Sequence, residues 1–116
     1  MVVKHISEVP VQTMEGYNGV SKQILIGRDD GSEEVVVRCF RLEPGGATPY
    51  HSHDFPHLVK VEEGEGVAVD ADGNEHSLHV GRLVYIPDNE MHGFKNPGTA
   101  PFVILCIVPG RGEKQG

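Results

Sequence analysis

The sequence predicts an all-β domain in which short strands close into a sandwich or a barrel. Short stretches rich in Val, Ile, Leu and Phe alternate with turn signals, which the 15 glycines and eight prolines supply. Glycine adopts the positive φ angles that turns need, and proline fixes the entry to a turn. Strands of this length, separated by frequent turns, are typical of sandwiches and barrels. The predicted strands are Ser21–Ile26, Val35–Leu42, Leu58–Glu62, Val67–Asp70, Leu83–Ile86 and Phe102–Val108.

The chain is short enough for one domain, and we expect residues 1–116 to form it. No stretch of ten or more residues has a clean helical period, and no internal repeat or linker divides the chain. We place the barrel core at about 20–110 and expect residues 1–20 to pack on the barrel or on a partner subunit. Residues Gly110 to Gly116 read as a frayed polar tail.

Composition argues against two classes of partner. The net charge of −7 disfavours nucleic acid, because the phosphate backbone selects for clustered Lys and Arg. No apolar run approaches the ~18 residues that cross a bilayer, and the chain start lacks the features of a signal peptide. We therefore expect a cytoplasmic protein with neither partner. Cys39 and Cys106 lie in apolar runs and read as buried free thiols, with Cys106 lining a site as the alternative.

Three of the seven histidines fall within the window from His51 to His57. On a strand, His51 and His53 would point to the same side, one pleat apart. The intervening Asp54-Phe55-Pro56 bends the chain and can return His57 to the same pocket. Neutral imidazole is the commonest protein ligand of first-row transition metals, so this cluster predicts a metal site. By contrast, His76 and His79 lie on opposite faces of one polar stretch, and we expect both to be exposed.

The segments 45–64 and 81–96 resemble the two motifs of the cupin superfamily. The first reads Gly45, five residues, His51, one, His53, three, His57, six, Gly64. The second reads Gly81, five residues, Pro87, one, Asn89, two, His92, three, Asn96. Asn89 stands where the family usually has glycine, and asparagine still suits a turn position with positive φ.

The resemblance implies a double-stranded β-helix, or jelly-roll barrel, with His51, His53, His57 and His92 as metal ligands. The family usually has a glutamate at the position of His57, so the chain is similar to the small four-histidine cupins. An all-neutral ligand set disfavours Mg²⁺ and Ca²⁺. We expect one divalent transition metal per chain, either Mn, Fe, Ni, Cu or Zn, with positions left open for water, O₂ or substrate.

Arg38 lies in the middle of an otherwise apolar predicted strand, where an unpaired charge would be costly. Two interpretations stay open. The side chain enters the barrel mouth and holds a substrate carboxylate, which would give it a catalytic role. Alternatively, it faces solvent or a partner subunit.

Three functions compete at this point. The first is a dioxygenase-like oxidoreductase acting on a small organic molecule at a redox-capable metal. The second is a non-redox isomerase or decarboxylase that uses the metal as a Lewis acid. The third is a small-ligand-binding cupin without catalysis. Cupins of this third kind are usually fused to a DNA-binding domain, for which 116 residues leave no room. Apolar strands beside the barrel and the segment before Ser21 also predict a homodimer.

Overall fold

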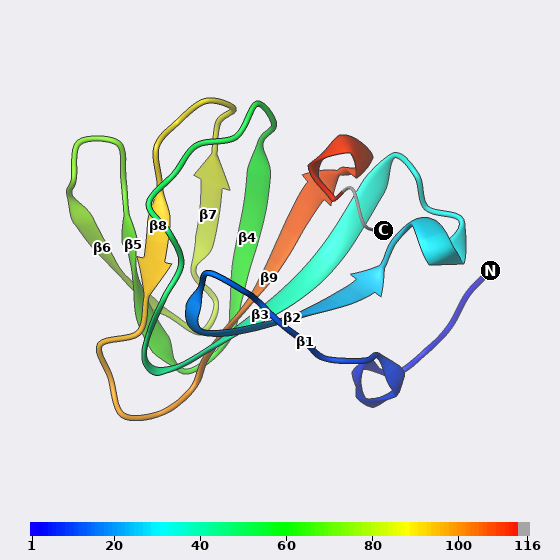
Figure 1. Ribbon diagram of the computed structural model, residues 1–116, viewed down its shortest axis with the longest axis horizontal. Helices are drawn as coiled ribbons and strands as arrows, with labels where there is room; N and C mark the ends of the chain where they lie inside the picture. Colours follow the sequence, from blue (N-terminus) through cyan, green and yellow to red (C-terminus); the bar gives the residue numbers. More distant parts are fainter. Residues whose placement is uncertain (114–116) are drawn as a thin grey trace.

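The computed structural model describes residues 1–113, in which nine strands form one strongly curled, antiparallel sheet (Figure 1). This confirms the all-β prediction and the jelly-roll architecture. The strands are β1 (Gln12–Thr13), β2 (Asn18–Ile26), β3 (Val35–Ala47), β4 (His57–Glu63), β5 (Glu65–Val69), β6 (Glu75–His79), β7 (Leu83–Ile86), β8 (Gly93–Lys95) and β9 (Phe102–Pro109). Three single 3₁₀ turns accompany them, η1 (Ile6–Glu8), η2 (Arg28–Asp30) and η3 (Gly110–Gly112). None of the helices in residues 1–113 is long and apolar enough to cross a membrane.

Strand β3 joins the two halves of the curled sheet, whose order is β6-β5-β8-β3-β9-β4-β7 with β2 and β1 added beside β3. Its first part pairs with β9, and its last residue, Ala47, pairs with Lys95 of β8. The sequence predicts that this strand ends at Leu42, whereas it continues through a bend at two glycines. Gly45 has a φ of 81°, and a Cβ on Gly46 would lie 2.8 Å from the Glu43 carbonyl oxygen. Only glycine permits the positive φ at the first position and the close approach at the second, so the bend requires these two glycines.

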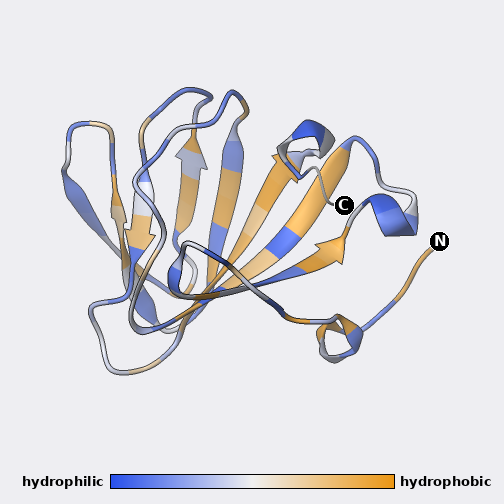
Figure 2. Ribbon diagram, viewed as in Figure 1, coloured by the Kyte–Doolittle hydropathy of each residue, from blue (hydrophilic) through white to orange (hydrophobic). Residues whose placement is uncertain are grey.

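The core lies on the concave side of the sheet, and strand β9 shows how it is built. Phe102, Ile104, Cys106 and Val108 are buried, while the residues between them are half-buried on the outer face. The sequence of β9 is apolar on both faces and leaves its orientation open; antiparallel pairing with β3 and β4 decides it. Figure 2 shows that β3 and β9 are largely apolar and that the loops at their ends are polar.

Segments near both ends of the described residues contact the sheet. The Gln23 side chain donates hydrogen bonds of 3.1 Å to the carbonyls of Ile6 and Val9, which holds the amino-terminal segment against β2. At the other end, η3 follows β9 directly, and Glu113 is 5% exposed.

The prediction of a frayed tail is therefore wrong for residues 110–113, and residues 114–116 lie outside the described part of the chain. The backbone N–H of Gly110 donates to the Glu34 carbonyl at 2.9 Å. A Cβ on Gly110 would collide with the Glu33 carbonyl, so a glycine is needed for this approach. The Glu113 side chain then finds Lys22 as a partner inside the barrel. A long-range ion pair of this kind leaves no trace in the local pattern of a polar, glycine-containing segment.

Candidate metal centre

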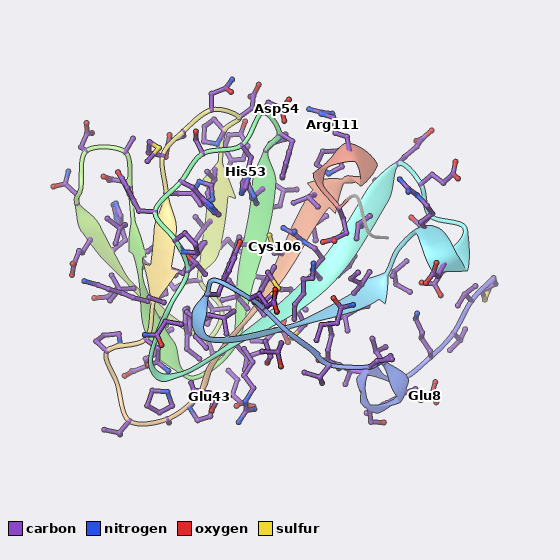
Figure 3. All side chains as sticks on the ribbon, viewed as in Figure 1. Glu8, Glu43, His53, Asp54, Cys106 and Arg111 are labelled. Atoms are coloured by element: carbon purple, nitrogen blue, oxygen red, sulfur yellow. The ribbon has the colours of Figure 1, made fainter. Side chains whose placement is uncertain are left out.

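Three predicted ligands, His51, His53 and His92, come together on the concave side of the sheet. One ring nitrogen from each lies within 4.8 Å of the others. Their ring centroids are 4.3 Å apart for His51–His53 and 5.3 Å for His51–His92. His53 lies on the long loop before β4, while Cys106 lies deeper, on β9 (Figure 3). The arrangement joins residues that are about forty positions apart in sequence.

Backbone hydrogen bonds fix this convergence. The N–H of His51 donates to the His92 carbonyl at 3.0 Å, and the N–H of His92 donates back at 2.8 Å. This is a single bridge rather than the strand that the spacing of His51 and His53 predicts. Pro49 and Pro56 flank the segment and lack the N–H groups that a longer ladder needs. The imidazoles nevertheless converge, because the bridge places His51 directly opposite His92.

The turn before His92 is built as the sequence predicts. Asn89 has a φ of 69°, and its N–H donates to the His53 carbonyl at 2.6 Å, so the second motif is tied to the first. The Nδ1 of His92 lies 2.9 Å from the Glu90 carbonyl oxygen. Since a carbonyl only accepts, Nδ1 carries the proton and Nε2 is left as the ligand atom.

His57 lies beside these three residues but is not part of the closest group. It opens β4, is 5% exposed, and its ring centroid lies 4.8 Å from that of His92 and 5.1 Å from that of His53. Its Nδ1 is buried and has no hydrogen-bond partner within residues 1–113. A buried nitrogen without a hydrogen-bond partner costs free energy, so such a group calls for an explanation, and a bound ion is one.

The electrostatics suit a transition metal. Burial, and then the neighbouring charges, lower the pKa of His53 to about 4 and that of His57 to about 3. Burial and the proximity of His92 also lower the pKa of His51. These imidazoles are therefore neutral at pH 7, the state that coordinates a metal. The donor set and the orphaned Nδ1 of His57 fit a first-row divalent ion.

The same pKa shifts predict how the metal-free protein responds to acid. In the unfolded chain His53 and His57 have ordinary pKa values of about 6.5, above their folded values, so the unfolded state binds protons first as pH falls. Stability present above about pH 6.5 is then lost progressively toward about pH 4. Urea unfolding of the metal-free protein between about pH 7.5 and about pH 5 measures it, in a range where ordinary carboxylates stay ionised. A midpoint that does not fall, or that falls equally in a His53→Asn/His57→Asn variant, contradicts this explanation.

A small cavity of about 60 Å³ adjoins the four histidines. Arg38 lines it and is 8% exposed, so this side chain enters the barrel and does not face solvent. Cys106 also lines the cavity, and both cysteines are buried and free, as expected. Tyr17 lines the cavity as well, and its ring meets that of His51 edge-on at 6.4 Å.

The sequence does not reveal Tyr17, which lines the cavity, or Glu113, which pairs with Arg38 behind it. Burial raises the pKa of Tyr17, so its hydroxyl stays protonated and can donate. Tyr17 precedes β2 in a polar stretch with no motif around it, and only the fold brings it to the cavity.

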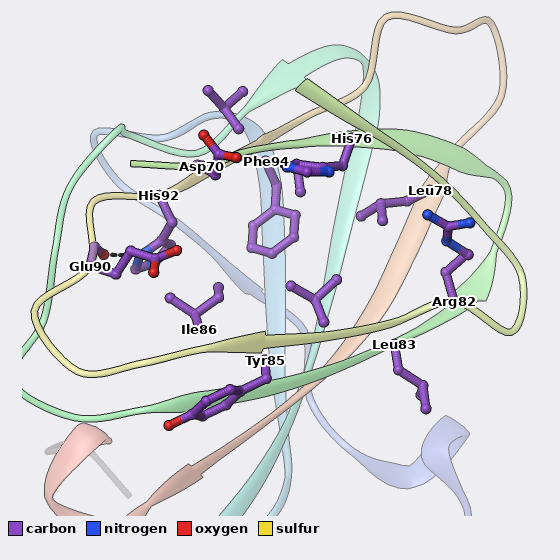
Figure 4. A pocket seen from close by; sticks show the side chains of 14 residues that line it. Asp70, His76, Leu78, Arg82, Leu83, Tyr85, Ile86, Glu90, His92 and Phe94 are labelled. Carbon is purple, nitrogen blue, oxygen red and sulfur yellow. Dashed lines mark hydrogen bonds and ion pairs between the residues drawn. The ribbon is translucent and has the colours of Figure 1, made fainter. Parts of the chain in front are cut away.

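A second, larger hollow of about 330 Å³ lies on the other side of His92 and Phe94, between β6 and β7 (Figure 4). Ile86 and Phe94 point into it, and His76 and Arg82 stand at its rim. His76 and His79 are exposed, as predicted, and His76 lies 2.8 Å from the Asp70 carboxylate. Of the His51–His53–His92 group, His92 alone lines this hollow.

Fold and site together define a small barrel with converging imidazoles at one end, and comparison with known proteins names its family. Residues 38–108 match the cupin domain family, which is more than half of the chain. The chain therefore belongs to the cupin family.

Two solved structures illustrate the kinship. The polyketide cyclase RemF from Streptomyces resistomycificus is 28% identical, with a TM-score of 0.90 over 95% of this chain and 80% of that one. A sugar phosphate isomerase of the cupin superfamily from Silicibacter pomeroyi is 26% identical, with a TM-score of 0.79 over 90% of this chain and 73% of that one.

Among curated proteins, the chain is similar to the HTH-type transcriptional activator RhaS of Yersinia pestis. The two are 42% identical over 65 residues, which is 56% of this chain but 23% of RhaS. The chain thus spans less than a quarter of the length of the curated relatives it matches.

Proposed function

We propose that this protein is a metal-dependent cupin enzyme that holds one divalent transition metal through His51, His53, His57 and His92. Its substrate is a small organic molecule that binds in the adjoining cavity. The observation that carries the proposal is the convergence of four imidazoles, one with an orphaned buried nitrogen, beside that cavity. Mn, Fe, Ni, Cu and Zn all suit such ligands.

We favour the non-redox reaction over the dioxygenase-like one because of Tyr17. A bound metal would supply Lewis-acid polarisation of a substrate carbonyl. Such a reaction also needs a group that moves a proton, and Tyr17, whose hydroxyl is protonated, lines the cavity next to His51. The cyclase and isomerase named above support this preference. The dioxygenase-like function is the second candidate, since a set of histidine ligands also suits redox-capable metals.

Loading the purified protein separately with Mn, Fe, Co, Ni, Cu and Zn tests the two candidates. We expect turnover of enolisable diketones or sugar phosphates under anaerobic conditions, with Zn or Co sufficient. Oxygen uptake with diketones, catechols, flavonols or thiols would establish the dioxygenase-like function instead. Stable ligand binding without turnover by any metal form would leave a binding module, the class to which the similarity with RhaS points.

Replacing Tyr17 by Phe is expected to lower kcat by about 100-fold or more, because general acid catalysis contributes that much. Metal content should not change, since Tyr17 is not a ligand. Tyr50→Phe is the matched control: the Tyr50 hydroxyl donates to the Asp70 carbonyl at 2.6 Å, away from the cavity. Full activity in Tyr17→Phe would remove the proton-transfer role.

We also propose that two copies pair through the outer face of the β4–β7 end of the sheet. Leu58 and Tyr85 are register partners there and are 50% and 63% exposed, with Ile107 of β9 beside Leu58. Contiguous apolar surface of this kind marks association sites.

Leu58→Glu should convert a dimer to a monomer in light scattering. Val11→Glu, at an apolar residue that is 64% exposed beside β1 at the far end of the sheet, should not. A monomeric wild-type protein at micromolar concentration contradicts the pairing.

A further inference from the structure

Three charged side chains meet inside the barrel, and one of them, Arg38, lines the cavity. Lys22 on β2, Arg38 on β3 and Glu113 after η3 are 7%, 8% and 5% exposed. Lys22 pairs with Phe40, and Ile24 pairs with Arg38, so the two cations stand on neighbouring strands and face the same side. Burying three charges in one place is costly unless they balance.

The charges do not balance, because two cations share one carboxylate. The Nζ of Lys22 lies 3.1 Å and 2.9 Å from the two Glu113 carboxylate oxygens and so engages both. Arg38 reaches only Oε1, through Nη1 at 3.2 Å. Lys22 therefore neutralises most of the negative charge of Glu113. The positive charge of Arg38 is left without a carboxylate of its own.

Arg38 is held in place with donors to spare. Its Nη2 donates to the Cys106 sulfur at 3.1 Å, and its guanidinium lies 5.0 Å from the centre of the Phe40 ring. Its Nε is buried and has no partner in the part of the chain that the structure describes. A guanidinium has five N–H groups, so a fixed cation with unused donors lines the cavity beside His53 and His57.

We propose that the cavity is built for an anionic ligand, and that Arg38 receives its carboxylate or enolate oxygen. This deepens the proposed function, on which it rests, by naming the substrate class. The ligand supplies the negative charge that the buried cluster lacks. Its oxygen accepts hydrogen bonds from the Arg38 N–H groups that have no partner in the protein. Because Glu113 and Cys106 already orient the guanidinium, binding requires little rearrangement of Arg38. Glu113 thus acts as a positioning residue.

Acetate tests the proposal, with its neutral isostere acetamide as the matched probe. In ¹⁵N–¹H spectra of the metal-free protein, we expect the Arg38 Nε–H resonance to shift and saturate with acetate but not with acetamide. The Arg41 Nε–H, which bonds Glu43 on the exposed face of the same strand, is the internal control. No acetate shift at Arg38, or an equal shift with acetamide, overturns the proposal.

Lys22→Met tests the charge balance without touching the cavity lining. With Lys22 gone, both Glu113 oxygens become available to Arg38, so acetate should bind several-fold more weakly. Unchanged affinity in a folded Lys22→Met protein contradicts the charge argument.

Zinc titration of the same wild-type sample separates this proposal from the metal site. Failure of zinc to shift the histidine ring resonances defeats the metal site, while the acetate response at Arg38 is read independently.

Discussion

His92→Ala is expected to abolish metal binding. His92 supplies the Nε2 that the Glu90 carbonyl orients, and it belongs to the closest group of three imidazoles. Changes around a ligand already weaken metal affinity by about 10–100-fold, so removing a ligand should cost at least as much. Metal content after reconstitution should fall from about one ion per chain to a trace, and metal should no longer raise the Tm.

Two further variants sharpen this expectation. His76→Ala removes an exposed histidine outside the cluster and should bind metal like the wild type. His57→Glu restores the ligand that the family usually has and should retain the metal, whereas His57→Ala should weaken it. If His92→Ala binds metal as tightly as the wild type, the cluster is not the metal site.

Glu113→Ala is expected to cause the largest loss of stability, about 3–5 kcal/mol, because it leaves two buried cations without a carboxylate. Urea unfolding of the metal-free protein at pH 7 gives the free energy. The loss should come from charge rather than from packing, since Glu113 makes its contacts through its carboxylate.

The surface pair of Arg41 and Glu43 gives the control, as both side chains are about half exposed. Glu43→Ala should change the free energy of unfolding by less than about 1 kcal/mol. Lys22→Met combined with Glu113→Leu should recover part of the loss, because it removes one cation together with the carboxylate. A loss of less than 1 kcal/mol in Glu113→Ala, no more than a surface pair, would show that the cluster is not electrostatically important.

The sequence predicts the fold class well because strands and turns carry local signals. Five of the six predicted strands coincide with observed ones to within three residues at each end, and the sixth, β3, runs five residues past its predicted end. That extension depends on the close approach of Gly46 to Glu43 and Gly19, which no local pattern reports. The positive φ of Asn89 was predictable from the turn in which it lies.

The candidate site is predictable only where its residues cluster in the chain. His51, His53 and His57 share one window, and the cupin resemblance adds His92. Arg38 stands out as a charge in an apolar strand, but its direction depends on register. Tyr17 reaches the cavity, and Glu113 reaches Arg38, from segments without regular patterning, so neither can be recognised before the chain folds.

X-ray absorption and elemental analysis of the natively purified protein test the central claim most directly. We predict about one first-row transition metal per chain, with an absorption spectrum that shows four imidazole nitrogens in its first shell. Three imidazoles would remove His57 from the ligand set and leave the site intact. A protein that holds no metal as purified, and takes up none on reconstitution, would contradict the account.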